Sequence, residues 1–159
     1  MKALNKFMSP AGEITIFSAT AKADAAEFWP AMGQHFASKD VFNAFGEPMF
    51  DHDAMIWVLA FINDRLVGFS ALDLDHLDKG DVLFTFSYVL PDFRLINVYG
   101  RMFDARVKLV ERDTDAKRIK AVCTKESEPM FEKHGFEKGP VRGRYTTYCK
   151  NIVRKAKAA

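Results

Sequence analysis

The stretch VLPDFRLINVYG, residues 89–100, places the strongest constraint on how this chain of 159 residues can fold. Upstream, residues 82–90 are rich in β-branched and aromatic side chains, which predicts a largely buried strand. Downstream, apolar residues recur at spacings of four, three and four, which places them on one face of a helix. These apolar residues are Val98, Met102, Ala105 and Leu109. Because the first amides of such a helix are unpaired at the positive end of its dipole, residues 89–100 predict a site for an anion such as phosphate.

The predicted helix also has a polar face. Arg101, Asp104, Lys108 and Arg112 lie opposite the apolar residues, and Asp104 stands four residues before Lys108. A carboxylate and an ammonium at that spacing lie on adjacent turns and attract each other. We therefore expect a surface helix that packs one face on the core.

Composition favours one globular domain, residues 1–159. Hydrophobic residues make up 48% of the chain and include 15 Phe, enough for one sizeable core. No apolar run approaches the ~20 residues that a membrane-spanning helix requires, and the N-terminus has no signal-peptide pattern. We therefore expect a cytoplasmic protein with no membrane partner, whose basic residues 150–159 form a frayed tail. Cys123 and Cys149 are isolated, which favours small buried residues over a metal site or a disulfide.

Further elements are predicted on both sides of residues 89–100. Residues 61–72, FINDRLVGFSAL, predict a β-hairpin, because its Asn-Asp pair tolerates the positive φ of a tight turn. Residues 118–123 predict another strand. Ser127, Pro129 and Gly135 mark the N-cap, the first turn and the end of a short helix. Strands and helices thus alternate as in an α/β domain.

In this order the chain resembles the GNAT N-acetyltransferase superfamily. Residues 89–94 and the helix after them look like its acyl-CoA-binding motif, whose core is [Gln/Arg]-x-x-Gly-x-[Gly/Ala]. The hairpin before the cofactor strand and the short helix that closes in Gly135-Phe136 are also similar. The resemblance covers roughly residues 13–149. It implies an α/β GNAT-like acyl-CoA N-acyltransferase fold, with a central mixed, mostly antiparallel sheet flanked by helices.

The motif departs from the family at two positions. Arg94 takes the first place of the core, Asn97 stands where the first Gly is usual, and Tyr99 where the second Gly or Ala is usual. Asn tolerates a positive φ better than other non-Gly residues, so Asn97 is expected to keep the turn that aims amides at a pyrophosphate. Tyr99 is expected at the helix start with its ring turned outward over the cofactor, beside Gly100, which relieves crowding.

The resemblance implies acetyl-CoA, or another acyl-CoA, as co-substrate. Its phosphates would lie at the helix start, and backbone amides of residues 88–90 would polarise the thioester carbonyl. The cofactor-binding residues implied in this way are Tyr88, Val89, Leu90, Arg94, Leu95, Asn97, Val98, Tyr99, Gly100, Arg101, Ser127 and Phe131.

No catalytic acid or base is evident. The family often carries a Tyr on the short helix before Gly-Phe, where this chain has Phe131. Ser127 can either bind the pantetheine arm of the cofactor or only cap the short helix, and both interpretations stay open. Candidate bases are His52 and Asp53 in a loop and Asp73 at the end of the hairpin. The candidate catalytic residues are therefore Ser127, Asp73 and His52.

The N-terminal third is less regular. Residues 13–18 predict a strand, and Thr20 predicts the cap of a helix in which Pro30 causes either a kink or a break. The apolar face predicted for this helix is Ala25, Trp29, Met32 and Phe36. Residues 37–53 predict a loop with one short helical turn. Its Phe and Met side chains either line an acceptor pocket or pin the loop to the core.

Charge is balanced globally but not locally. A net charge of +2 argues against a dedicated nucleic-acid-binding domain. Basic residues nonetheless crowd residues 136–159, which indicates either a rim that attracts phosphates or a solvated edge strand and tail. Four acids surround Gly80 without the spacing of an EF-hand, and they predict a polar turn. These acids are Asp73, Asp75, Asp78 and Asp81.

The favoured hypothesis is an acyltransferase that moves an acetyl or other acyl group from acyl-CoA to an amine. The acceptor is a small molecule, a peptide or a nucleic acid, and a homodimer is one open assembly. One alternative is a GNAT-like transferase that modifies nucleic acid, motivated by the basic C-terminal residues. The other is a non-catalytic module that binds acyl-CoA or a partner, motivated by Phe131, Tyr99 and the missing base.

Overall fold

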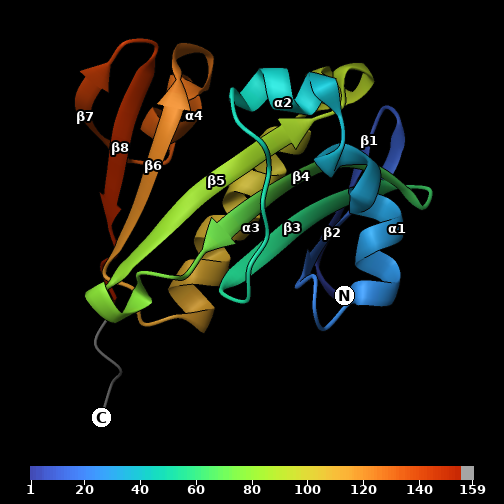
Figure 1. The fold of residues 1–159 in the computed structure, drawn as a ribbon, viewed down its shortest axis with the longest axis horizontal. Coiled ribbons are helices and arrows are strands. Elements are labelled where there is room, and N and C mark those ends of the chain that lie inside the picture. Colours follow the sequence, from blue (N-terminus) through green and yellow to red (C-terminus); the bar gives the residue numbers. More distant parts are fainter. Residues whose placement is uncertain (155–159) are drawn as a thin grey trace.

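A computed structural model describes residues 1–154, which form a single eight-stranded sheet with helices on both faces (Figure 1). The strand order is β1-β2-β3-β4-β5-β6-β8-β7, and every neighbouring pair is antiparallel except the parallel pair β5 and β6. The strands are β1 (Lys2–Ser9), β2 (Gly12–Ala19), β3 (Met55–Ile62), β4 (Arg65–Asp73), β5 (Asp81–Val89), β6 (Arg118–Thr124), β7 (Glu137–Arg142) and β8 (Tyr145–Asn151). The predicted mixed, mostly antiparallel α/β fold is confirmed.

Helices cover the two faces of the sheet unequally. The helices are α1 (Ala25–Phe36), α2 (Lys39–Phe45), α3 (Val98–Asp113) and α4 (Glu128–Lys133), with 3₁₀ turns η1 (Leu77–Lys79), η2 (Pro91–Ile96) and η3 (Lys125–Ser127). Helices α3 and α4 pack on one face, and α1 and α2 on the other (Figure 1). On the second face, Val122 in β6 is 58% exposed, so within residues 1–154 no helix covers this part of β6. Within residues 1–154, no helix is both apolar enough and long enough to cross a bilayer.

Helix α3 begins and packs as the sequence predicts. Val98 and Met102 are fully buried, and Ala105 and Leu109 are nearly so. The predicted pairing of Asp104 with Lys108 is replaced by a tertiary contact, because a carboxylate oxygen of Asp104 lies 2.6 Å from Nε2 of His134. His134 follows α4, so this contact joins the two helices on that face.

The hairpin of β3 and β4 sets how closely α3 approaches the sheet. Asn63 and Asp64 have φ of 48° and 64°, the left-handed turn that the sequence predicts. Gly68 is the fourth residue of β4, and a Cβ added there would stand 3.0 Å from a methyl of Val98 and 3.1 Å from Met102. Only a residue without a side chain lets α3 pack this close to β4.

The N-terminal elements differ most from the sequence prediction. Strand β1 was not predicted, because its residues are mostly exposed and lack an apolar alternation. Helix α1 runs unbroken through Pro30, and it buries Phe28 and Met32. The predicted face through Ala25 and Trp29 was wrong, since both are exposed. Residues 37–53 contain more helix than predicted, because Ser38 caps α2 by accepting from the amide of Val41.

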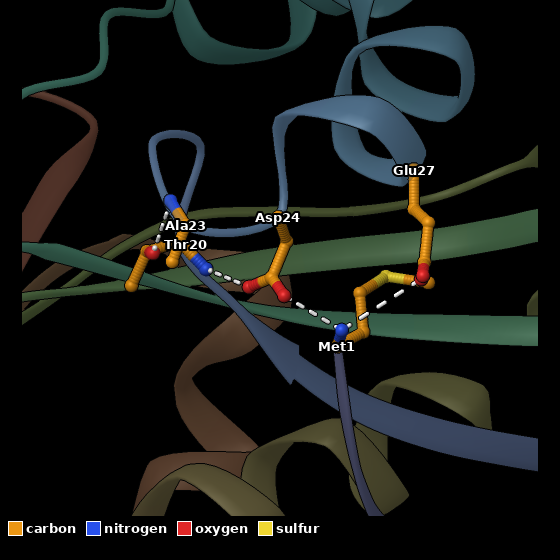
Figure 2. Close-up of polar contacts among 5 residues, drawn as sticks. All are labelled: Met1, Thr20, Ala23, Asp24 and Glu27. Carbon is orange, nitrogen blue, oxygen red and sulfur yellow. Dashed lines mark hydrogen bonds and ion pairs between the residues drawn. The ribbon is translucent and has the colours of Figure 1, made fainter.

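A carboxylate ties the start of β1 to the start of α1. Asp24 accepts a hydrogen bond from the amide of Thr20 at 2.9 Å and an ion pair from the α-amine of Met1 at 2.6 Å, as Figure 2 shows. The Thr20 hydroxyl accepts from the amide of Ala23, so Thr20 caps this turn and not the helix that was predicted. The Met1 contact lowers the pKa of Asp24, and the same contact raises the pKa of the amine.

The C-terminal strands bring several basic residues into contact with the fold. Strand β8 extends to Asn151, so the prediction of a frayed tail is wrong for residues 150 and 151. Residues 155–159, the rest of that predicted tail, lie outside the described chain. Nζ of Lys150 donates to the carbonyl of His134, and Arg154 donates to the carbonyl of Ala116 at 3.1 Å. These two side chains have structural partners, which the sequence alone did not indicate.

The acidic cluster forms a turn that opens β5. Asp81 accepts from Nε of Arg118 at 2.7 Å and lies 2.9 Å from Nζ of Lys120, both on β6. Hydrogen bonds from Lys120 and Arg118 lower the pKa of Asp81. Through these ion pairs, Asp81 holds the parallel strands β5 and β6 together where they first meet. As a separate point, no three His, Cys, Asp or Glu side chains within residues 1–154 group as a metal site would require.

We predict that Asp81→Asn lowers the free energy of unfolding at pH 7 by about 1 kcal/mol. The pKa of Asp81 is below its unfolded value of 3.8, so its contribution is complete above that pH and is lost as pH falls through the folded pKa. When the free energy of unfolding is measured in urea from pH 7 to pH 2.5, the difference between wild type and variant should therefore disappear below about pH 4. The control Asp78→Asn, on the same turn and exposed, should show no gap. A gap that persists at low pH would contradict the ion-pair explanation.

Candidate functional site

The candidate site is a cleft between β5 and β6. The two strands pair only from Asp81 with Arg118 to Phe84 with Ala121, and then they diverge toward their C-terminal ends (Figure 1). The space between them has a volume of about 500 Å³. Its walls come from residues 44–47 after α2, residues 83–87 of β5, residues 122–124 of β6, Tyr99 and Arg106 of α3, Ser127, Phe131 of α4, and Tyr145.

A β-bulge separates the strands. The register between β4 and β5 shifts between Phe69 and Ala71, and Phe86 opposite this shift has a φ of 49°. A bulge bends its strand and increases the local twist. As a result β5 turns away from β6, and its edge from Thr85 onward has no strand partner in β6. Backbone groups on this edge are free to hydrogen-bond a ligand that lies in the cleft.

Aromatic packing holds the bulge in place. The Phe86 ring turns to the α1 and α2 face, where it stacks on Trp57 at 6.2 Å and meets Phe50 edge-on at 4.9 Å. Phe45 at the end of α2 also contacts it, at 5.4 Å. A non-Gly residue with positive φ stores strain that surrounding contacts must offset. Phe45 and Phe50 thus pack on the bulge, and Phe45 also lines the cleft, so both interpretations of the aromatic residues in residues 37–53 stay open.

Two helix starts lie at the open end of the cleft. Helix α3 follows the C-terminal end of β5 and α4 follows that of β6, so both begin where the strands are farthest apart (Figure 1). Asn97 has a φ of 62°, which confirms the left-handed turn predicted before α3. The first backbone bond of α3 runs from Arg101 to Asn97. The amides of residues 98–100 are left for another acceptor.

Arg94 lies beside this helix start. Its Nε donates to the carbonyl of Val89 at 2.9 Å, and its guanidinium carbon lies 5.4 Å from the ring centroid of Tyr88. Within residues 1–154, its two terminal nitrogens have no hydrogen-bond partner. Leu95 on the same turn is 99% exposed, whereas Arg101 packs over the ring of Phe7 in β1, away from the cleft.

Tyr99 lies inside the cleft, whereas the sequence predicts an outward ring. The ring meets Phe103 edge-on at 6.1 Å, and its phenol lies next to Arg106 and Ser127. Burial raises the pKa of the Tyr99 phenol, and the positive Arg106 and the Ser127 hydroxyl oppose that rise. At Gly100 an added Cβ would lie 2.2 Å from Oδ1 of Asn97, so this position has little room for a side chain while Asn97 keeps its place.

The wall opposite Tyr99 contains Ser127, Phe131 and Cys123. Ser127 precedes α4, but its side chain makes no capping hydrogen bond and instead faces the cleft. Phe131 is 4% exposed and stacks on Tyr148 at 5.2 Å. Burial and the nearby Glu128 raise the pKa of Cys123 to about 11, so its thiol stays protonated at neutral pH.

His52 and Asp73 form a pair outside the cleft. Nε2 of His52 lies 3.1 Å from Asp73, and Nδ1 accepts from the amide of Ala54. Both ring nitrogens are thus engaged, so His52 has no free lone pair for the proton of an amine. Neither residue lines the cleft, and the Phe50 ring, which stacks on His52 at 6.0 Å, packs against Phe86 of the cleft wall.

Arg106 is a cleft residue that the sequence analysis missed. It lies on α3 four residues after Met102 and four before Val110, so its position falls on the buried stripe. The polar face predicted for this helix did not include it. An Arg on an apolar stripe was the signal that could have identified it.

No protein-family model matches the sequence, and no curated protein matches it either. Many solved structures match the fold. The GNAT domain of PAT from S. lividans is 11% identical over 93% of this chain and 96% of that chain, with a TM-score of 0.70. An acyl-CoA N-acyltransferase from Pseudomonas aeruginosa is 10% identical over 86% and 99%, also with a TM-score of 0.70. The N-acetyltransferase PseH from Campylobacter jejuni, solved with acetyl coenzyme A, is 11% identical over 64% and 71%, with a TM-score of 0.54. The chain has the GNAT acyl-CoA N-acyltransferase fold.

We predict that Asn97→Ala destabilises the protein by about 1 kcal/mol, because Ala pays the full steric cost of the left-handed conformation. Asn97→Gly should reduce the free energy of unfolding less than Asn97→Ala does, because Gly adopts the left-handed conformation readily. Denaturant unfolding of both variants measures the difference. Asn63→Ala is the matched control, since Asn63 in the hairpin turn also has a positive φ. If Asn63→Ala lost stability and Asn97→Ala did not, the turn before α3 would not be left-handed in solution.

Proposed function

We propose that this protein is an acyltransferase that binds acetyl-CoA or another acyl-CoA and transfers the acyl group to an amine. One observation carries the proposal: the free edge of β5 leads along an open cleft to the uncapped amides of α3. A thioester arm can lie along such an edge while its phosphates reach the helix start. PseH, which has this fold, was solved with acetyl coenzyme A.

In this proposal the phosphates of the cofactor lie at the start of α3. The amides of residues 98–100 and the terminal nitrogens of Arg94 are the donors, and Asn97 aims them. The hydrogen bond from Nε to the Val89 carbonyl already restrains the Arg94 side chain before a ligand binds. Its two terminal nitrogens can therefore bind a phosphate with little further loss of side-chain entropy. The free edge of β5 supplies the backbone for the pantetheine arm, and the Ser127 hydroxyl faces the same cleft. The Leu90 amide, which the sequence predicts as a donor to the cofactor, instead donates to the carbonyl of Val67 on β4.

The reaction follows from the groups that meet in the cleft. The amine nitrogen attacks the thioester carbonyl carbon, and a backbone N–H on the free edge of β5 stabilises the oxygen as negative charge develops. The C–S bond then breaks, and the sulfur leaves as a thiolate that needs a proton. The Tyr99 phenol is the hydroxyl that supplies it, with Arg106 beside it to stabilise the phenolate. Alignment of the two reactants contributes the larger share of the acceleration.

The acceptor enters from the α1 and α2 face in this proposal, because no helix covers β6 there and Val122 is 58% exposed. We assign no base: His52 has no free ring nitrogen, and Asp73 is bound to it. The amine therefore arrives unprotonated or loses its proton to solvent. A cytoplasmic location and a small-molecule or peptide amine complete the proposal. A nucleic-acid acceptor has less support, because Lys150 and Arg154 already form hydrogen bonds within the fold.

We predict that acetyl-CoA binds in isothermal titration and that Arg94→Ala weakens this binding by about 1.5 to 3 kcal/mol, the value of a charge-assisted hydrogen bond. Arg112→Ala, on the exposed end of α3, is the control and should bind as wild type does. Absence of binding by any CoA species below millimolar concentration would overturn the proposed function. Equal affinity of wild type and Arg94→Ala would limit Arg94 to a structural role.

We predict that Tyr99→Phe lowers kcat for transfer from acetyl-CoA on the order of 10²-fold. The effect lies at the low end for a positioned acid because a thiolate is already a good leaving group. The KM for acetyl-CoA should change little, since the ring remains. Tyr145→Phe makes the same chemical change on the far wall and serves as the control. An unchanged kcat would mean that the proton comes from another source. Tight CoA binding with no turnover on a broad amine panel would favour a non-catalytic module.

A further inference from the structure

Arg106 is a buried cation without a counterion. Its side chain is 1% exposed, and its guanidinium carbon lies 4.2 Å from the ring centroid of Phe84 and 5.3 Å from that of Phe103. Nη1 donates a long hydrogen bond of 3.4 Å to the carbonyl of Ala71. Nε and Nη2 have no hydrogen-bond partner within residues 1–154, and no carboxylate there pairs with this guanidinium.

Such a group is costly to retain without a purpose. Burial lowers the pKa of Arg106 to about 10, so the guanidinium remains positive at neutral pH. Aromatic faces, one carbonyl and the neighbouring Tyr99 phenol offset only part of the desolvation of a cation with five N–H donors, because none of them is a carboxylate. Buried charges in proteins are normally paired, and the missing partner of a guanidinium is normally a carboxylate or a phosphate.

A second buried group near Arg106 also lacks a partner. The Ser70 hydroxyl is fully buried and has no hydrogen bond within the described chain. Ser70 precedes Ala71, whose carbonyl accepts from Arg106. Phe69 and Ala71 face the α1 and α2 side, so by strand alternation Ser70 faces the α3 side, as Arg106 does. Two orphaned polar groups thus lie on the same side of the sheet.

The position of Arg106 decides which part of a ligand would reach it. Phe84, under the guanidinium, is the last residue of β5 that pairs with β6, so Arg106 lies at the closed end of the cleft. The start of α3 lies at the open end, eight residues or about 12 Å earlier along the helix. A cofactor whose phosphates bind at the open end therefore directs its acyl group toward Arg106. The acceptor, which enters from the α1 and α2 face, lies on the other side of the sheet.

We propose that the cleft selects an acyl-CoA whose acyl chain ends in a carboxylate, such as succinyl-CoA, and that Arg106 is the residue that recognises this carboxylate. Nε and Nη2 bind the two carboxylate oxygens, and Nη1 keeps its hydrogen bond to the carbonyl of Ala71. This inference rests on the proposed function and specifies its acyl donor. No bond of this carboxylate forms or breaks in the acyl transfer.

Titration calorimetry without acceptor tests this inference. Succinyl-CoA and butyryl-CoA have equal carbon chains and differ in the terminal carboxylate, and free CoA reports on the rest of the cofactor. We expect wild type to bind succinyl-CoA about tenfold more tightly than butyryl-CoA, or better. Arg106→Met should reverse or abolish this preference, and the control Arg112→Met should keep it. Thermal unfolding of unliganded Arg106→Met should show no loss of stability, because Met removes an unpaired buried charge.

The outcomes separate the inference from the proposed function. If free CoA fails to bind wild type, the proposed function fails, and this inference fails with it. If CoA binds but wild type binds succinyl-CoA and butyryl-CoA equally, only the inference is overturned, whether or not the variant folds. If Arg106→Met weakens all three ligands equally and lowers the melting temperature, Arg106 is a structural residue. A preference that Arg106→Met retains overturns the inference as well.

Discussion

Two parallel strands that share only a few residue pairs determine most of this structure. Strands β5 and β6 pair from Asp81 to Phe84 and then separate. At the start of the paired segment, Asp81 forms ion pairs with Arg118 and Lys120 of β6. The separation leaves an edge of β5 unpaired, opens a cleft through the sheet and brings the starts of α3 and α4 to its mouth (Figure 1). Tyr99 and Arg106 line the cleft because α3 crosses behind the gap and not behind a continuous sheet.

The two faces of the sheet stabilise this separation in different ways. On the α1 and α2 face, Phe86 stacks on Trp57, so the strained bulge is compensated by aromatic packing. On the α3 and α4 face, Phe131 packs edge-on against Phe103 at 4.9 Å and closes the core around the cleft. Rigid aromatic clusters on both sides mean that the cleft is formed without a ligand. A preformed site loses less free energy to ordering when it binds.

Local sequence signals predicted the elements, and tertiary contacts decided the rest. The turn at Asn63 and the left-handed Asn97 follow from side chains that act on their own backbone, so the sequence predicted them correctly. Strand β1 gave no pattern because an exposed edge strand needs no apolar alternation. In α1, Phe28 is buried and Trp29 is not, because Phe28 packs against Trp57. Trp57 is distant in sequence, so the local pattern could not indicate this contact. The inward ring of Tyr99 was also unpredictable, since it depends on a cleft that other elements form.

The departures from the family motif and the buried cation are best understood as one arrangement. A Gly or Ala at position 99 would leave the space that the phenol fills beside Arg106 empty. This chain has Tyr99 on one wall and the apolar Phe131 on the other, and Phe103 packs against both rings. The hydroxyl thus moves from α4 to α3, where a positive neighbour favours its phenolate. Under the proposed function, Tyr99, which stands where the motif has Gly or Ala, is therefore the proton donor for the thiolate, and its phenol is also a polar neighbour of the Arg106 guanidinium at the closed end of the cleft.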